Sequence, residues 1–184
     1  MSVSSDGELA ARAQSGDRDA FEALVGRTLP RVRAFLFRLA GPRADADDLA
    51  QETFLVAVRR LGELREPDRV LSWLFGIGVR VHRSRASAPR LPISDALDVA
   101  ALAVGGRDGD AVERAEARGE LFDALERLPL RCREAFLLRH VEELSPSQTA
   151  DALGVPEGTA RRWDFEARER LRRILSGRGL GATS

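Results

Sequence analysis

Residues 145–175 read SPSQTADALGVPEGTARRWDFEARERLRRIL and carry the clearest local structural signals in the chain. Ser145 and Gln148 match a capping box, with proline at the first helical position, so we predict that a helix begins here. Gly154 is the glycine that commonly ends a helix, and a second helix is predicted to begin at about Glu157. A short helix, a tight turn and a longer arginine-rich helix are typical of a helix-turn-helix. A plain helical hairpin is the alternative.

The second of these helices carries the most suggestive side chains. Arg161, Phe165 and Arg168 share one face, and Arg162 lies beside it. Guanidinium groups on a helix that fits the major groove can read guanine edges or hold phosphates. The alternative is a solvated face with ion pairs between residues four apart. We assign Trp163 to the core rather than to base stacking.

Charge in the rest of the chain is segregated, although the 29 basic and 29 acidic residues of the 184 balance. Residues 27–44 hold five arginines and no acidic residue, and residues 78–90 hold four arginines and no acidic residue. Residues 91–127 are acidic and residues 159–184 are basic again. Every basic residue is arginine, which suits bidentate contacts with phosphate.

The composition excludes several classes of protein. With 43% apolar and 32% charged residues, the chain is not disordered throughout. No apolar run approaches the roughly 20 residues of a membrane span, and polar residues rather than a signal sequence follow Met1, so we expect a cytoplasmic protein. Cys132 is the only cysteine and there are two histidines, which excludes disulfide scaffolds and His/Cys metal sites. We expect no metal, no cofactor and no small-molecule substrate.

Helical periodicity without strand alternation predicts an all-α protein of two small domains. Helices are expected from Asp17 to about Leu39, with Pro30 marking a kink or break, from Asp45 to about Leu61, and from Arg69 to Ala86. Residues 1–86 would form one small bundle. Residues 87–111 are rich in Ala, Gly, Asp and Pro and are predicted to be a flexible linker.

Residues 112–184 would form the second domain. Its expected core includes Leu121, Phe122, Leu125 and Leu128, and then a helix over residues 131–142 with the core residues Phe136, Leu137 and Val141.

An acidic face stands out on the helix over residues 45–61. Asp48, Gln51, Glu52 and Leu55 fall on one side of it, within an otherwise basic domain. Paired carboxylates can serve catalysis or Mg²⁺, but no histidine, cysteine, lysine or glycine-rich phosphate loop accompanies them. We therefore interpret the face as a binding surface for a basic partner.

Several segments together resemble a known family. DADDLAQETF at residues 45–54, GDRDAFEAL at 16–24 and SWLFGI at 72–77 are similar to conserved region 2 of extracytoplasmic-function (ECF) sigma factors. LPLRCREAFLLR at 128–139 and QTADALGVPEGT at 148–159 are similar to their region 4. The resemblance extends over nearly the whole chain outside the linker, with the motifs in the family's order.

The resemblance implies a transcription initiation subunit that binds core RNA polymerase and promoter DNA, with no catalytic activity. The helix from Asp45 would dock on the polymerase through Asp47, Asp48, Leu49, Gln51, Glu52 and Phe54. The loop over residues 62–68 and the helix after it would hold the melted minus-10 element through Glu63, Leu64, Arg65, Trp73, Arg80 and Arg83. The helix-turn-helix would bind the minus-35 element through Thr159, Arg161, Arg162, Phe165 and Arg168. An anti-sigma partner is also expected.

Three departures of this chain from the family pattern are notable. Where the family runs GTVKSRL, residues 158–164 read GTARRWD, so Trp163 stands in place of Arg and Asp164 in place of a core Leu. Thr149 replaces a usual Ile. We expect Trp163 to supply the lost core contact. Two alternatives follow: a helix-turn-helix regulator that is not a polymerase subunit, and a sigma-like protein that binds polymerase without specific minus-35 recognition.

Overall fold

The computed structural model describes residues 4–41, 44–87 and 111–176, with the backbone alone for residues 111–118. The helices, in chain order, are α1 (Asp6–Gln14), α2 (Arg18–Ala40), α3 (Ala46–Arg60), α4 (Val70–Ser87), α5 (Ala111–Glu126), α6 (Leu130–Phe136), α7 (Pro146–Leu153) and α8 (Glu157–Ser176). Short 3₁₀ turns η1 (Leu61–Glu63) and η2 (Pro67–Arg69) separate α3 from α4, and a π-helical turn η4 (Leu137–Val141) continues α6. Within these ranges there is no strand, which confirms the all-α prediction.

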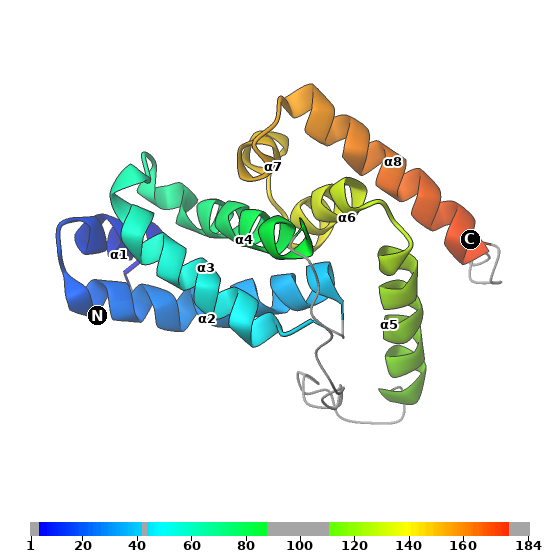
Figure 1. The fold of residues 1–184 in the computed structure, drawn as a ribbon, viewed down its shortest axis with the longest axis horizontal. Helices are drawn as coiled ribbons and strands as arrows, with labels where there is room; N and C mark the ends of the chain where they lie inside the picture. Colours follow the sequence, from blue (N-terminus) through cyan, green and yellow to red (C-terminus); the bar gives the residue numbers. More distant parts are fainter. Residues whose placement is uncertain (1–3, 42–43, 88–110, 177–184) are drawn as a thin grey trace.

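Two groups of helices make up the molecule (Figure 1). Helices α1–α4, the N-terminal bundle, contact one another, and α5–α8, the C-terminal group, follow beyond α4. Among the described residues, no helix is both long enough and apolar enough to cross a membrane. The predicted linker lies outside the described residues except at its ends, where Ser87 closes α4 and Ala111 opens α5.

Local signals account for the starts of α2 and α3. The Asp45 side chain accepts hydrogen bonds from the backbone N–H groups of Asp47 and Asp48, both at 3.0 Å, and so caps α3. Asp17 caps α2 in the same way through the N–H of Ala20, at 3.0 Å. These bonds satisfy donors that the first helical turn leaves free, so the sequence alone places both starts.

Three expectations need correction. Pro30 neither breaks nor ends α2, which runs through it with Val32, Phe35, Leu36 and Leu39 buried beyond it. The proline removes one backbone donor, and burial of this apolar stripe outweighs that loss. Leu121, expected in the core, is exposed. The helix predicted over residues 131–142 changes to a π turn at Leu137, where the N–H of Glu142 reaches the Leu137 carbonyl at 2.9 Å.

Helix α1 was not expected. Its signal is nevertheless present, because Ser5 and Glu8 form a complete capping box of the same kind as Ser145 and Gln148. The Gln14 side chain, at the other end of α1, donates to the carbonyls of Leu61 and Leu64 at 3.0 and 2.7 Å. Helix α1 therefore fixes the segment between α3 and α4 from outside.

The N-terminal bundle and the C-terminal group pack directly against each other. Helix α4 contacts α7, α2 contacts η4, and buried apolar residues of both groups belong to one continuous cluster. Gly76 of α4 lies so close to α7 that a Cβ atom there would stand 3.0 Å from the Ala152 carbonyl oxygen and 3.1 Å from its Cα. A small residue at position 76 is therefore what lets the two helices approach.

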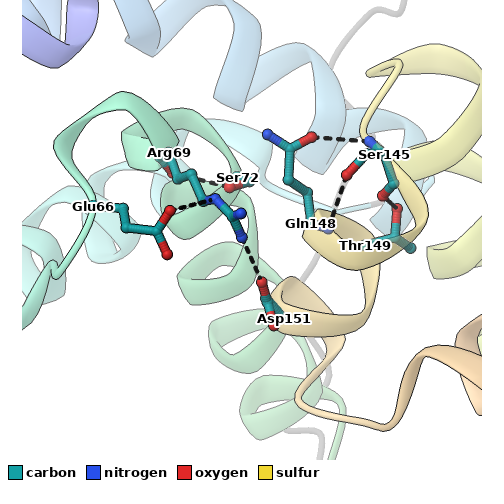
Figure 2. Close-up of polar contacts among 7 residues, drawn as sticks. All are labelled: Glu66, Arg69, Ser72, Ser145, Gln148, Thr149 and Asp151. Atoms are coloured by element: carbon teal, nitrogen blue, oxygen red, sulfur yellow. Dashed lines mark hydrogen bonds and ion pairs between the residues drawn. The ribbon is translucent and has the colours of Figure 1, made fainter.

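Ion pairs also cross this contact. Glu142, buried at the end of η4, accepts from Arg31 of α2 at 2.8 Å and lies 3.5 Å from Arg38. Figure 2 shows a second crossing, in which Arg69 bridges Glu66 of its own loop, at 2.8 Å, and Asp151 of α7, at 3.1 Å. Because a buried carboxylate needs a charged or hydrogen-bonding partner, the Glu142 pairs tie the two groups together.

Candidate nucleic-acid and polymerase interface

The acidic face of α3 is exposed, as predicted for a binding surface. Asp47, Asp48 and Gln51 are exposed, and Glu52 is half-buried. Two arginines of the same bundle already neutralise part of this face: Arg33 pairs with Asp47, and Arg85 lies 2.7 Å from Glu52 and 3.8 Å from Asp48. An incoming basic partner would compete with these arginines, because exposed ion pairs of this kind are weak.

Two residues predicted for this surface face inward instead. Leu49 is buried among the core residues of the N-terminal bundle, and Phe54 is half-buried against them. The apolar residues that do reach solvent are Leu55, 54% exposed, and Val58, 52% exposed. Their spacing from Gln51, by four and seven residues, puts them on the same side of α3. The sequence placed Leu55 on this face, but Val58 was missed although its helical spacing could have identified it.

The segment between α3 and α4 is a pair of 3₁₀ turns rather than an open loop. Glu63 and Arg65 are exposed, whereas Leu64 is buried. Arg60 holds Glu63 at 2.5 Å, and this hydrogen bond is the main reason why the pKa of Glu63 lies below its ordinary value. Of the three loop residues predicted to meet DNA, only Glu63 and Arg65 offer their side chains to a ligand.

Helix α4 brings Trp73 and Arg80 to one side of the bundle, seven residues apart. Trp73 is half-buried and Arg80 is exposed. Burial of part of the Arg80 side chain, and then the nearby charges of Arg60 and Arg83, lower its pKa. Trp73 and Arg80, on the same side of α4, offer a stacking surface and a cation for phosphate.

The Arg83 side chain, in contrast to that of Arg80, is bound to another residue of the protein. Its Nε donates to Glu134 Oε1 at 2.8 Å and its Nη2 to Oε2 at 2.5 Å. Glu134 belongs to α6, in the C-terminal group, and its side chain is 0% exposed. The arrangement seen here therefore directs a predicted DNA-binding residue into the contact between the two groups of helices.

The helix-turn-helix has the geometry that the sequence predicted. In Figure 2 the Ser145 hydroxyl accepts from the Gln148 N–H at 3.2 Å, while the Gln148 side chain accepts from the Ser145 N–H at 2.9 Å. Gly154 ends α7 at φ 68°, a conformation that favours glycine. Ala150 and Ala160 are buried where α7 meets α8.

Helix α8 presents its predicted DNA-binding side chains to solvent. Arg161, Arg162 and Arg168 are exposed, Thr159 is half-buried, and Phe165 is 59% exposed. The Arg168 guanidinium lies 6.0 Å from the centre of the Phe165 ring, so these two side chains form one patch. Arg161 also pairs with Glu157, at 2.5 Å.

Trp163 is buried, as predicted, with the Arg131 guanidinium 5.5 Å from the centre of its ring. Packing of Trp163 leaves the neighbouring arginines outside, so the altered motif does not remove the exposed basic face. Asp164, the second departure, is also buried. Within residues 4–41, 44–87 and 111–176 no group of three or more His, Cys, Asp or Glu side chains could hold a metal ion.

Two family models match this chain. Residues 24–87 match the family model described as Sigma-70 region 2, and residues 118–171 match Sigma-70, region 4. The chain is 34% identical over 176 residues to the ECF RNA polymerase sigma-E factor of Haemophilus influenzae, covering 90% of this chain and 93% of the relative.

Two solved structures are similar over most of their length. One is CnrH in complex with the cytosolic domain of CnrY, with a TM-score of 0.69, 27% identity, and coverage of 94% of this chain and 97% of that one. The other is the sigma factor RpoE in complex with the anti-sigma factor NepR from Bartonella quintana, with a TM-score of 0.65, 25% identity, and coverage of 85% and 96%. With both sigma regions present in order along one helical chain, this protein belongs to the ECF family of RNA polymerase sigma factors.

Proposed function

We propose that the chain directs core RNA polymerase to promoters through three separate exposed surfaces. Residues 1–86 would bind the polymerase and the minus-10 element, residues 112–184 would bind the minus-35 element, and residues 87–111 would connect them. The observation that carries this proposal is the separation of chemistry: an acidic and apolar face on α3, Trp73 with the exposed Arg80 on one side of α4, and an arginine and Phe face on α8.

The polymerase-binding surface consists of Asp47, Asp48, Gln51 and Glu52 with Leu55 and Val58. Two exposed apolar side chains beside carboxylates suit a partner helix that is itself part apolar and part basic, because burial supplies affinity while charge supplies orientation. Arg85 would give up Glu52 when such a partner binds. That exchange of one cation for another is why pairing within the bundle does not rule out docking.

For the minus-10 element we propose Glu63, Arg65, Trp73 and Arg80 as the first contacts. Unstacking a base costs a few kcal/mol, which stacking and phosphate contacts must offset. Arg83 would join them only after release from Glu134. Because this release separates α4 from α6, promoter binding and opening of the contact between the two groups are coupled in this proposal.

For the minus-35 element we propose that α8 enters the major groove with Arg161, Arg162, Phe165 and Arg168, and with Thr159 at its start. This face is exposed while the N-terminal bundle and the C-terminal group are in contact, an arrangement that we call closed. Duplex recognition therefore does not require the two groups to separate, in contrast to the minus-10 contacts.

We further propose control by an anti-sigma partner, with no catalytic activity in the chain itself and with the cytoplasm as its place of action. The similarity to RpoE, a structure solved with the anti-sigma factor NepR, supports this form of control. Such a partner would act by favouring the closed arrangement, in which Glu134 holds Arg83. Affinity capture of the chain from cells should recover the anti-sigma partner while the chain is inhibited, and core polymerase once the chain has been released.

The proposal is tested by reconstituted transcription with purified chain, core polymerase and fragments of the source genome. Transcript starts that appear only with the chain, and that share two motifs at a fixed spacing, are expected. The double variant D48R/E52R should abolish these starts, because two new positive charges repel a basic partner, while binding of α8 to duplex DNA persists.

The matched control is E22R, which reverses an exposed carboxylate on α2 that is paired with Arg18 at 3.2 Å but lies outside the three surfaces. It should leave transcription unchanged. Loss of starts with E22R as well as D48R/E52R would point to a general charge effect. Retention of starts by D48R/E52R would contradict docking through α3, and duplex binding with no core binding in the unmodified chain would favour a helix-turn-helix regulator.

A further inference from the structure

Asp164 is a charged residue on the buried face of the proposed recognition helix. It is 8% exposed and shares the inward side of α8 with Ala160, Ala167 and Leu171, all buried. An isolated carboxylate in such a place is strongly unfavourable, so its partners decide whether the helix can pack there. Both of its oxygens have a partner, and the partners lie on different elements.

The first partner is His140 of the π turn η4. The distance between His140 Nε2 and Asp164 Oδ1 is 2.7 Å, and the centre of the imidazole lies 4.8 Å from that of the Phe136 ring, with the two ring planes tilted by 35°. The His140–Asp164 pair connects η4 with α8, and its two residues are 24 positions apart in the sequence.

The second partner is Arg168, whose Nε lies 3.5 Å from Asp164 Oδ2. The Arg168 guanidinium also lies 6.0 Å from the centre of the Phe165 ring, so a carboxylate and an aromatic ring are both near it. An arginine that such neighbours restrain loses less conformational entropy when it binds a base or phosphate. Through this ion pair a buried residue can influence the direction in which Arg168 points.

A hollow of about 260 Å³ opens beside this array, between α7, α8 and η4. Arg139, Arg161 and Arg168 line it together with Asp164. Arg161 is also paired with Glu157, so three guanidinium groups stand against two carboxylates, and the hollow keeps a positive balance suited to DNA phosphate.

We infer that Asp164, fixed by His140, is a positioning residue that sets the direction of Arg168 and thereby the base sequence that α8 prefers. The inference rests on the proposed minus-35 role of α8. In this chain a polar array occupies the site that the family pattern fills with a leucine. We therefore expect α8 to prefer a different minus-35 base sequence rather than to lose its sequence preference.

Two measurements test it. The first needs no DNA: the Nε–H signal of Arg168 is followed by NMR in the full chain and in D164N, which keeps the side-chain size but removes the charge. We expect slow exchange of this hydrogen in the unmodified chain and exchange at least about fivefold faster in D164N. An unchanged exchange rate would overturn the inference whatever α8 binds.

The second measurement uses holoenzyme reconstituted with core polymerase on a promoter library randomised in the minus-35 region. D164N, D164L and H140L should each change the relative use of the preferred minus-35 bases by about fivefold or more, the scale of one base-reading arginine. H140Q should restore the original preference, because its amide can donate to Asp164 from a position close to that of Nε2.

The control is E169Q, which removes a carboxylate of α8 that is paired with Arg172 rather than with Arg168. It should leave the base preference unchanged. If all three variants keep the original preference while remaining folded by circular dichroism, the inference is wrong. If the unmodified holoenzyme shows no minus-35 preference, the proposed role of α8 fails, and the NMR result still decides whether Asp164 positions Arg168.

Discussion

Arg83 of α4 and Glu134 of α6 form a bidentate ion pair between the N-terminal bundle and the C-terminal group, with N–O distances of 2.8 and 2.5 Å. The carboxylate is fully buried, whereas the arginine side chain is 33% exposed. The pair thus joins the two halves of the sigma factor at a residue proposed to meet promoter DNA. Disruption of this pair should affect the arrangement of the two groups before it affects either group alone.

Arg83→Met should loosen the contact between the two groups. The variant leaves Glu134 without its cation, and the carboxylate regains water only if α6 moves away from α4. We expect a larger radius of gyration in small-angle X-ray scattering, and a loss of stability of up to about 3 kcal/mol, less than for a fully enclosed pair because water reaches Arg83.

Arg85→Met is the matched control, since Arg85 pairs with Glu52 inside the N-terminal bundle. It should not change the radius of gyration. The double variant R83M/E134Q removes the orphaned charge and should recover much of the compact form. An unchanged radius in R83M would show that the ion pair does not hold the two groups together.

Acidification should weaken the same contact through His82. Burial, and then the positive charges of Arg133 and Arg83, lower the pKa of His82 below its ordinary value of 6.5, and its Nδ1 is buried without a hydrogen-bond partner. Below pH 6.5 the unfolded chain therefore binds a proton that the folded chain does not. Stability should fall as the pH falls through this window, by up to about 1.4 kcal/mol per pH unit.

The measurement is urea unfolding between pH 7 and pH 5 for the chain and for His82→Phe. His82→Phe has no group to protonate at this site. As the pH drops, its free energy of unfolding should therefore fall less than that of the unmodified chain. Parallel pH profiles for the two proteins would contradict this assignment of His82.

Gly76→Ala should separate α7 from α4 while leaving the N-terminal bundle intact. An alanine is favoured over glycine within a helix by about 1 kcal/mol, but its Cβ would lie 3.0 Å from a backbone oxygen of α7. The backbone of α7 can make room for the methyl group only if the whole helix shifts. We expect faster hydrogen exchange in α7 with unchanged protection in α2 and α3.

Gly78→Ala provides the comparison, because the nearest atom to its Cβ is the flexible end of Leu36, at 3.1 Å, inside the bundle. Its effect should fall on α2 and spare α7. Equal exchange in α7 for G76A and the unmodified chain would mean that the two groups accommodate the methyl group without parting.

Ser145→Ala should destabilise the helix-turn-helix by about 1 kcal/mol. The variant removes the hydroxyl that caps the Gln148 N–H and leaves half of the capping box. Urea denaturation followed by circular dichroism measures the change. Ser147→Ala, at an exposed position two residues after the cap, should change the free energy of unfolding by less than about 0.5 kcal/mol. Similar losses in both variants would rule out the cap as the cause.

Much of the fold follows from signals that act within a few residues. The capping box at Ser145 and the caps at Asp17 and Asp45 place helix starts, and Gly154 ends α7. The inward position of Trp163 and the exposed arginines of α8 follow from helical spacing alone. These features depend on contacts between near neighbours in the chain, which is why the sequence is sufficient to predict them.

The tertiary structure alone decides which side chains of each surface are free. The family resemblance predicts that Leu49 contacts polymerase and Leu64 contacts DNA, but both are buried in the core, while Val58 reaches solvent on α3. Periodicity defines the two sides of a helix, but it does not say how far the neighbouring helices wrap around it. That depends on the packing of α1, α2 and α4.

The contact between the two groups of helices has no counterpart in the sequence analysis, which expected two domains on a flexible linker. Arg83 and Glu134 are 51 residues apart, and Arg31 and Glu142 are 111 apart. In the sequence each is one charge among many. Only the positions of the helices that carry them select these pairs, because an ion pair with a buried carboxylate depends on angstrom-scale distance and on partial exclusion of water, and no local pattern encodes either.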